Sequence, residues 1–274
     1  MSAAWLLLVP VAILAYTHLL AAAGWAFQKA EAGGQFGIEA RILALIAREG
    51  VARALFRSLS PLGWGRARLR PVAIRGVGEK PLPPLLLVPG IHFNRASLRF
   101  LVIFLRHRGW RWVWPLHRPR GRGVTLAGHA AHVSAAVREL RDATGAAQVD
   151  VVAFSSGGLA VAWGLRHDPE LAGQVRRVVT LATPWQGTKL AVFGQSASHR
   201  EVRYGSPVIE GLWPEESDVV CIWSPDDPVV VPADSAAPPA GDDATDVSIE
   251  SAGHVELLIS ARAFRAVQAA LERP

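Results

Sequence analysis

One short stretch of the chain constrains its fold more than any other: an apolar run that leads directly into a glycine-rich turn and a helical pattern. The run covers Val149–Phe154, and the turn is Ser155-Ser156-Gly157-Gly158. A continuous Val-rich run bounded by helical segments is typical of a parallel strand buried on both faces of its sheet. The stretch therefore predicts a strand–turn–helix unit within an α/β domain.

Similar apolar runs alternate with helical patterns from about residue 71 onward, with no internal repeat. This alternation predicts a mostly parallel sheet with helices on both faces, and residues 71–274 are interpreted as one domain. Strands are expected at Val72–Arg75, Leu85–Val88, Trp112–Trp114, Val149–Phe154, Val178–Ala182, Val219–Trp223 and Val247–Ile249, and helices at Ala96–Arg108, Ala127–Ala143, Gly157–Leu165 and Val255–Leu271.

The first 28 residues form an apolar segment that stands apart from this pattern. No charged residue occurs between Ala3 and Phe27, and a helix from Trp5 to Trp25 would be about 30 Å long, which matches the apolar core of a bilayer. Residues 1–28 are therefore predicted to form a transmembrane anchor helix. A helix buried in a globular body and a signal peptide cleaved near Ala21-Ala22-Ala23 are the alternatives.

The charges near this segment give an expectation for topology. No Lys or Arg precedes it and several follow, so the positive-inside rule places the body on the cytoplasmic side, whereas cleavage would give an exported protein. Residues 29–70 are interpreted as a basic lead-in, with a helix over 37–59. From Arg41 to Arg75 there are eight arginines and a single acid, Glu49. This basic run indicates either contact with anionic lipid or an ordinary solvated helix face.

Composition excludes several classes of protein. Half of the residues are apolar and only 19% are charged, which excludes an intrinsically disordered chain. The single Cys221 excludes an intramolecular disulfide and a multi-cysteine metal site. His129 and His132 lie three residues apart without a third candidate ligand, so no metal is expected. Arginines interleaved with tryptophans between Pro81 and Arg138 permit nucleic-acid binding, but a basic surface that faces anionic lipid is favoured.

Three residues in a defined chain order indicate nucleophilic catalysis. Ser155 follows a strand and opens a helix, Asp227 follows the next-to-last strand, and His254 follows the last. Ser, Asp and His in this order and context are typical of a serine nucleophile, a carboxylate that orients the imidazole and a histidine base. Ser155 is favoured over Ser156 because a sharp turn needs small residues two positions away on either side. Asp227 is favoured over Asp226 because the carboxylate usually stands just before a short apolar turn.

Acyl transfer also requires two backbone N–H groups that bind the developing oxyanion. The residue after the nucleophile supplies one, which is Ser156 in this chain. The turn that follows an early strand supplies the other, and after Leu85–Val88 this turn is Pro89-Gly90-Ile91. Pro89 has no N–H, so Ile91 is the candidate donor.

These residues resemble the α/β-hydrolase superfamily, and within it the lipase class 2 and lactonizing-lipase-like serine esterases. Val88-Pro89-Gly90-Ile91 is similar to the Val-His-Gly-Ile oxyanion turn, and residues 153–158 are similar to the Gly-His-Ser-Met-Gly-Gly elbow. Residues 180–188 are similar to the Thr-Pro-His-x-Gly-Thr segment. The resemblance covers about residues 84–272, with Pro89, Phe154 and Trp185 where the family has histidine.

The resemblance implies an α/β-hydrolase domain over residues 71–274 that cleaves carboxylic esters of apolar or lipid substrates without a cofactor. The same three residues would also serve an acyltransferase or a thioesterase, and the scaffold hosts non-catalytic interaction proteins as well. Residues 190–214 are expected to form either an apolar cap over the site or a surface loop packed on the core.

Overall fold

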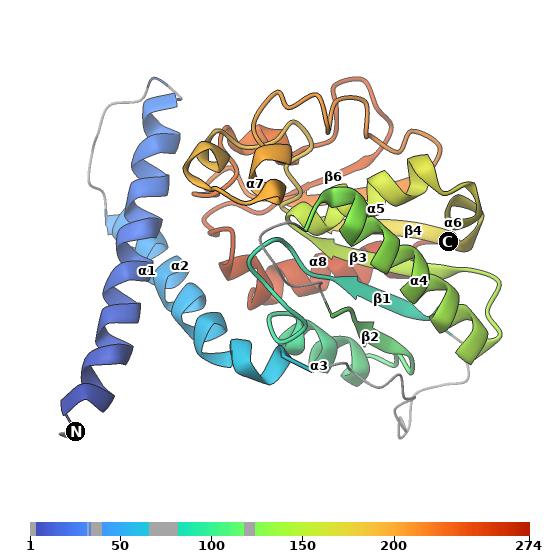
Figure 1. Ribbon diagram of the computed structural model, residues 1–274, viewed down its shortest axis with the longest axis horizontal. Coiled ribbons are helices and arrows are strands. Elements are labelled where there is room, and N and C mark those ends of the chain that lie inside the picture. The colour runs from blue at the N-terminus through green and yellow to red at the C-terminus, as the bar shows by residue number, and fades with distance from the viewer. Residues whose placement is uncertain (1–3, 32, 34–39, 66–81, 118–123) are drawn as a thin grey trace.

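The computed structural model describes residues 4–31, 33, 40–65, 82–117 and 124–274. Its central element is a six-stranded sheet whose strands all run parallel, in the order β2-β1-β3-β4-β5-β6. Figure 1 shows the sheet between two layers of helices, with α1 and α2 along one side of the molecule. The strands are β1 Leu85–Val88, β2 Val113–Pro115, β3 Val149–Phe154, β4 Val175–Leu181, β5 Asp218–Trp223 and β6 Thr245–Ser248.

The helices precede the sheet, connect consecutive strands or, in the case of η4 and α8, follow the last strand. The α-helices are α1 Ala4–Glu31, α2 Ala40–Leu59, α3 Arg99–His107, α4 Leu126–Thr144, α5 Ser156–His167, α6 Pro169–Gln174, α7 Ala197–Glu201 and α8 Ala261–Glu272. Short 3-10 helices occur at η1 Ser60–Gly63, η2 Lys189–Phe193, η3 Ala233–Ala236 and η4 Glu256–Leu258.

Successive side chains of each strand point to opposite faces of the sheet, so each face has its own core. Leu85 and Leu87 of β1 pack with residues of α3 and α8, and Phe56 of α2 joins this face. Leu86 and Val88 pack on the opposite face with residues of α4 and α5. Because both faces are covered, β1, β3 and β4 are buried along nearly their whole length, which explains their apolar sequences, whereas the edge strand β6 is partly exposed.

The strand and helix predictions are largely confirmed. The bounds of β1 and β3 match the expected ranges, and the other described strands agree to within a few residues. The strand expected at Val72–Arg75 lies outside the described residues. The helix expected over 255–271 is wrong in its first part: η4 ends at Leu258, and α8 begins at Ala261, where the Ser260 side chain accepts a hydrogen bond from the Ala263 N–H and so starts a new helix.

The prediction of a transmembrane anchor over residues 1–28 is not supported. Among the described residues, no helical stretch combines the length and the hydropathy that a bilayer span requires. Instead, α1 buries one stripe against the protein itself. Thr17, Ala21 and Trp25 are buried four residues apart, and Gly24 packs directly against the backbone of Pro228. Apolar residues at this helical spacing serve protein packing here.

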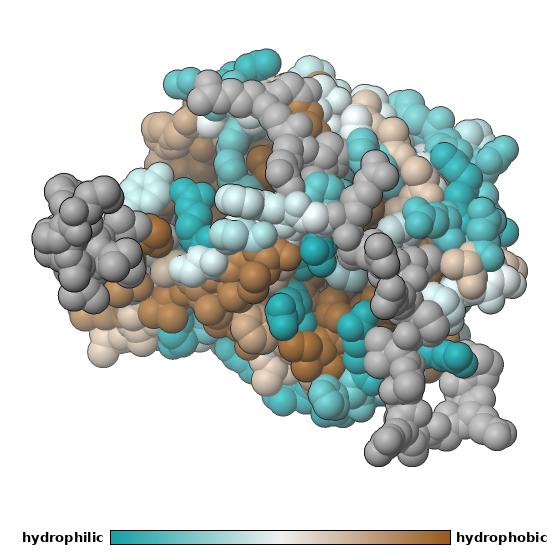
Figure 2. Space-filling view, turned by 60° about the horizontal axis from the view of Figure 1, so that its bottom comes forward, coloured by the Kyte–Doolittle hydropathy of each residue, from teal (hydrophilic) through white to brown (hydrophobic). Residues whose placement is uncertain are grey.

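The other sides of α1 and α2 leave apolar side chains in contact with solvent. Figure 2 shows apolar residues gathered on the side of the molecule that these two helices form. Near the C-terminal end of α1, the Phe27 ring packs edge to face on the ring of Phe193 from η2, with 6.4 Å between the ring centroids. The exposed large apolar side chains in this part of the structure include Leu14, Tyr16, Leu19, Leu20, Leu43, Val51, Leu62, Trp64 and Phe193.

Candidate active site

Ser155 lies on a strained turn between β3 and α5. Its backbone has φ +55° and ψ −135°, a conformation that residues other than glycine rarely adopt. Two glycines allow this turn to pack tightly. A Cβ on Gly90 would lie 2.9 Å from the Ser155 Cβ, and a Cβ on Gly157 would lie 2.8 Å from the Val88 carbonyl oxygen. The turn after β1 therefore lies directly against Ser155, as the sequence predicts.

The segment after β4 also binds the Ser155 turn. The Thr183 hydroxyl donates to the Ser155 carbonyl oxygen at 2.9 Å, and Gly158 has no Cβ that would collide with the Thr183 side chain. In the same segment, the Thr188 hydroxyl donates to the Val229 carbonyl oxygen at 2.6 Å and accepts from the Val231 N–H at 3.0 Å. The segment thus connects the serine turn to the loop that follows β5.

That loop carries Asp227, which forms a buried pair with His254. The Asp227 Oδ2 lies 2.6 Å from the His254 Nδ1, and the two residues are 0% and 2% exposed. The other carboxylate oxygen, Oδ1, accepts from the backbone N–H groups of Val229 at 2.7 Å and Val230 at 2.9 Å. Because an ionised carboxylate only accepts hydrogen bonds, Nδ1 carries the proton and Nε2 is left as the basic nitrogen.

The neighbouring Asp226 points elsewhere. Its Oδ2 accepts from the Ser251 N–H at 2.8 Å, and its Oδ1 lies 4.0 Å from the Arg41 guanidinium. Of the two aspartates that the sequence leaves open, Asp227 is therefore the one that contacts the histidine. Asp226 instead links its own loop to the start of the histidine loop.

The structure brings the serine turn and the histidine to the same edge of the sheet. Ser155, Asp227 and His254 all follow the carboxyl ends of strands, where parallel α/β sheets place their sites. The Phe154 ring, next to the serine, packs 4.9 Å from the His254 imidazole. Ser155 and His254, both in the described part of the chain, are not hydrogen-bonded to each other. Such contacts in free enzymes often tighten only when substrate binds.

The two expected oxyanion donors are each next in sequence to a residue of the serine turn or of the loop packed on it. Ser156 is the first residue of α5, so its N–H has no carbonyl partner within the helix. Ile91 is half-buried and follows Gly90, which packs against Ser155. Both residues thus adjoin the serine turn through the chain, and their role as oxyanion donors stays a prediction.

Solved structures with the same architecture include several lipases and esterases. Lipase BlEst2 of Bacillus licheniformis, in its mature form, superposes with a TM-score of 0.61 at 16% identity over 73% of this chain and 96% of that one. Lipase B of Aspergillus fumigatus gives a TM-score of 0.60 at 17% identity over 70% of this chain, which spans about half (53%) of that lipase. This chain has the α/β-hydrolase fold. No protein-family model matches it, and no curated protein matches it in sequence.

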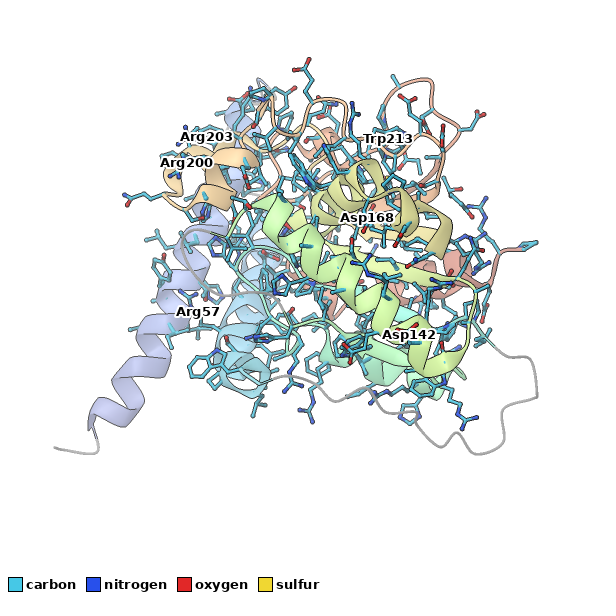
Figure 3. The ribbon with its side chains drawn as sticks, turned by 45° about the vertical axis from the view of Figure 1, so that its right-hand side comes forward. Arg57, Asp142, Asp168, Arg200, Arg203 and Trp213 are labelled. Atoms are coloured by element: carbon cyan, nitrogen blue, oxygen red, sulfur yellow. The ribbon has the colours of Figure 1, made fainter. Side chains whose placement is uncertain are left out.

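The connection between β4 and β5, in which either an apolar cap or a surface loop packed on the core was expected, divides into two parts. Ile209 and Leu212 are 3% exposed, and the Trp213 ring packs edge to face on Trp185 at 4.6 Å, so this part covers the core. Phe193 in η2 is 74% exposed. Figure 3 shows Trp213 well apart from Arg200 and Arg203, which lie at α7.

The described residues contain no group of three or more side chains suited to hold a metal ion.

The sequence interpretation missed the residues that hold the histidine loop. The Ser224 hydroxyl donates to the Ala252 carbonyl oxygen at 2.7 Å, and Glu49 of α2 accepts from the Val255 N–H at 2.9 Å. For Glu49 a signal was present, because it is the one acid in a run that holds eight arginines. Nothing in the pattern, however, connects residue 49 with residue 255.

Proposed function

We propose that this protein is a serine hydrolase that cleaves carboxylic esters through an acyl-enzyme on Ser155. The observation that carries the proposal is the buried Asp227–His254 hydrogen bond beside the strained serine turn. A buried carboxylate that fixes the tautomer of a histidine at the carboxyl edge of the sheet is the arrangement by which hydrolases of this fold activate a serine. The lipases and esterases among the structural neighbours agree with this chemistry.

The mechanism follows from the position of each group. His254 Nε2 removes the proton from the Ser155 hydroxyl as Oγ attacks the ester carbonyl carbon, and Asp227 stabilises the imidazolium that forms. The N–H groups of Ser156 and Ile91 bind the negative oxygen of the tetrahedral intermediate. As the intermediate collapses, the carbon–oxygen bond to the leaving alcohol breaks, and His254 returns the proton to it. Water, deprotonated by the same histidine, then releases the acid from Ser155.

An apolar acyl ester is the substrate class that we propose. The exposed apolar side chains of α1, α2 and η2 lie beside exposed Arg41 and Arg48, and residues 1–204 contain 26 basic and 10 acidic side chains. An apolar and basic surface of this kind suits an anionic lipid interface as the source of the ester. A panel of aryl esters of increasing chain length, offered free and in anionic or zwitterionic vesicles, would test this. Equal rates on all of them would argue against a lipid ester.

Covalent labelling tests the proposed nucleophile directly. A fluorophosphonate probe reacts with activated serines, so the native protein is expected to be labelled and Ser155→Ala is expected to lose both labelling and ester turnover. Ser156→Ala serves as the matched variant, since its backbone N–H remains and its buried hydroxyl makes no hydrogen bond with the described residues. Labelling that survives in Ser155→Ala, or that disappears only in Ser156→Ala, would refute the assignment.

A further inference from the structure

Glu49 of α2 is a buried carboxylate in direct contact with the histidine loop. It is 0% exposed. Its Oε2 accepts from the backbone N–H groups of Val255 at 2.9 Å and Glu256 at 3.0 Å, and its Oε1 accepts from the Arg53 guanidinium at 2.7 Å. The two N–H groups belong to the residues that immediately follow His254. A side chain from the start of the chain thus binds the backbone next to the proposed catalytic base.

The Glu49 carboxylate matches the hydrogen-bonding needs and the space of the histidine loop. Val255 and Glu256 open the 3-10 helix η4, and the N–H groups at the start of a helix have no partner within it. A carboxylate is a strong acceptor for such groups, because the hydrogen bonds are charge-assisted. Gly253, just before the histidine, leaves the space that the carboxylate fills, since any Cβ there would collide with Glu49.

The histidine loop is bound both by α2 and by the loop that carries Asp227. On the α2 side, the Arg48 guanidinium donates to the Ser251 carbonyl oxygen at 2.8 Å and pairs with Glu256 at 2.7 Å. On the side of the aspartate loop, Ser224 binds the Ala252 carbonyl and Asp226 binds the Ser251 N–H. Among these partners, Glu49 is the one that binds backbone N–H groups directly after His254, next to the imidazole.

A buried charge at this position is costly unless it has a role that an apolar residue could not fill. Removing a carboxylate from water carries a large desolvation penalty, and well-packed apolar residues often stabilise a protein as much as a buried ion pair does. Two backbone donors cannot be satisfied by an apolar side chain, however. We propose that Glu49 is a positioning residue for His254, which makes α2 part of the active site. This inference rests on the proposed serine-hydrolase function.

Two substitutions at Glu49 separate placement from general stability. Glu49→Gln keeps the size and one acceptor oxygen but sets an amide N–H against the Arg53 donor, and Glu49→Ala removes both hydrogen bonds to the loop. Asp150→Asn is the matched control. Asp150 is also 0% exposed and pairs with an arginine, Arg176, at 2.7 Å, but it lies at the start of β3, at the opposite end of the sheet from Ser155.

Steady-state kinetics on an aryl ester, below the unfolding temperature of each variant, is the first measurement. Small displacements of a catalytic group lower the rate without changing substrate binding, so kcat is expected to fall about tenfold in Glu49→Gln and about 100-fold in Glu49→Ala, with KM nearly unchanged. Asp150→Asn is expected to lower the unfolding temperature and to keep its kcat. An unchanged kcat in both Glu49 variants, or an equal loss in Asp150→Asn, would overturn the inference.

A second measurement does not depend on activity. The proton in the short Asp227–His254 hydrogen bond is expected to give a far-downfield proton NMR signal in the folded protein. Displacement or loss of that signal in both Glu49 variants, with retention in Asp150→Asn, supports the positioning role even if the native protein cleaves no ester. In that case the proposed function fails and the placement stands. An unshifted signal in both Glu49 variants refutes the placement, whatever their activity.

Discussion

The hydrogen bonds of Asp227 predict how a single substitution would inactivate the site. In Asp227→Asn the side chain keeps its size but must place one oxygen and one NH₂ group. The N–H groups of Val229 and Val230 both point at Oδ1, so the amide oxygen takes that position. The reverse orientation would leave two buried N–H groups facing an NH₂ group, at a cost of about 2–6 kcal/mol. The NH₂ group therefore faces His254.

An NH₂ donor at this position reverses the tautomer of the imidazole. Nδ1 must then accept, so the proton moves to Nε2, and the nitrogen that should remove the proton from Ser155 is no longer basic. Loss of the correct tautomer costs about 10⁴-fold in kcat in serine hydrolases, which corresponds to about 5 kcal/mol of transition-state stabilisation. Stability should change little, because the hydrogen bonds to Val229 and Val230 remain.

Single-turnover kinetics with an aryl ester would measure this loss in the acylation step. Asp226→Asn is the matched control: its amide oxygen can still accept from the Ser251 N–H, so most of the activity should remain. An acylation rate constant in Asp227→Asn within tenfold of the native value would show that the orienting carboxylate is not Asp227. A large loss in Asp226→Asn with none in Asp227→Asn would transfer that role to Asp226.

Two further predictions concern stability and reactivity. Because Ser155 has a positive φ, Ser155→Gly should raise the free energy of unfolding in urea by about 1 kcal/mol while abolishing activity. Ser155→Ala keeps the strained Cβ and should show no gain in stability. A loss of stability in the glycine variant would contradict the strain at Ser155. Burial raises the pKa of the Cys221 thiol to about 11, so iodoacetamide at neutral pH should alkylate it only after denaturation, and rapid labelling of the native protein would contradict its burial.

The sequence predicted the features of this fold that are encoded locally. The β3 strand and the Ser155 turn lie within ten consecutive residues, where an apolar run, small residues and a helical pattern agree with one another. The need for a second oxyanion donor indicated the turn at Gly90, and the family resemblance added the segment around Thr183, and the structure places both against Ser155. Motifs of this kind can be recognised because each is short and has a single local purpose.

Features that depend on distant partners were not predictable. The apolar pattern of α1 does not distinguish a lipid environment from a protein surface, and only the packing of Gly24 on Pro228 reveals the partner. The contact of Glu49 with Val255 joins residues 206 positions apart. The end of η4 was missed for a local reason instead: the chain from 255 to 271 reads as one helix, and the Ser260 cap that divides it was not recognised.

The long reach of Glu49 has a consequence for synthesis. A chain that is still being made can fold its N-terminal helices early, and domains generally form from the N-terminus during translation. The histidine loop, however, finds its support only when residues 253–256 have emerged and returned to a helix formed some 200 residues earlier. If the proposed function holds, a nascent chain would therefore have no competent nucleophile until residues 253–256 had been made and had reached α2. The proposed ester cleavage would then report that α2 and residues 253–256 have come together.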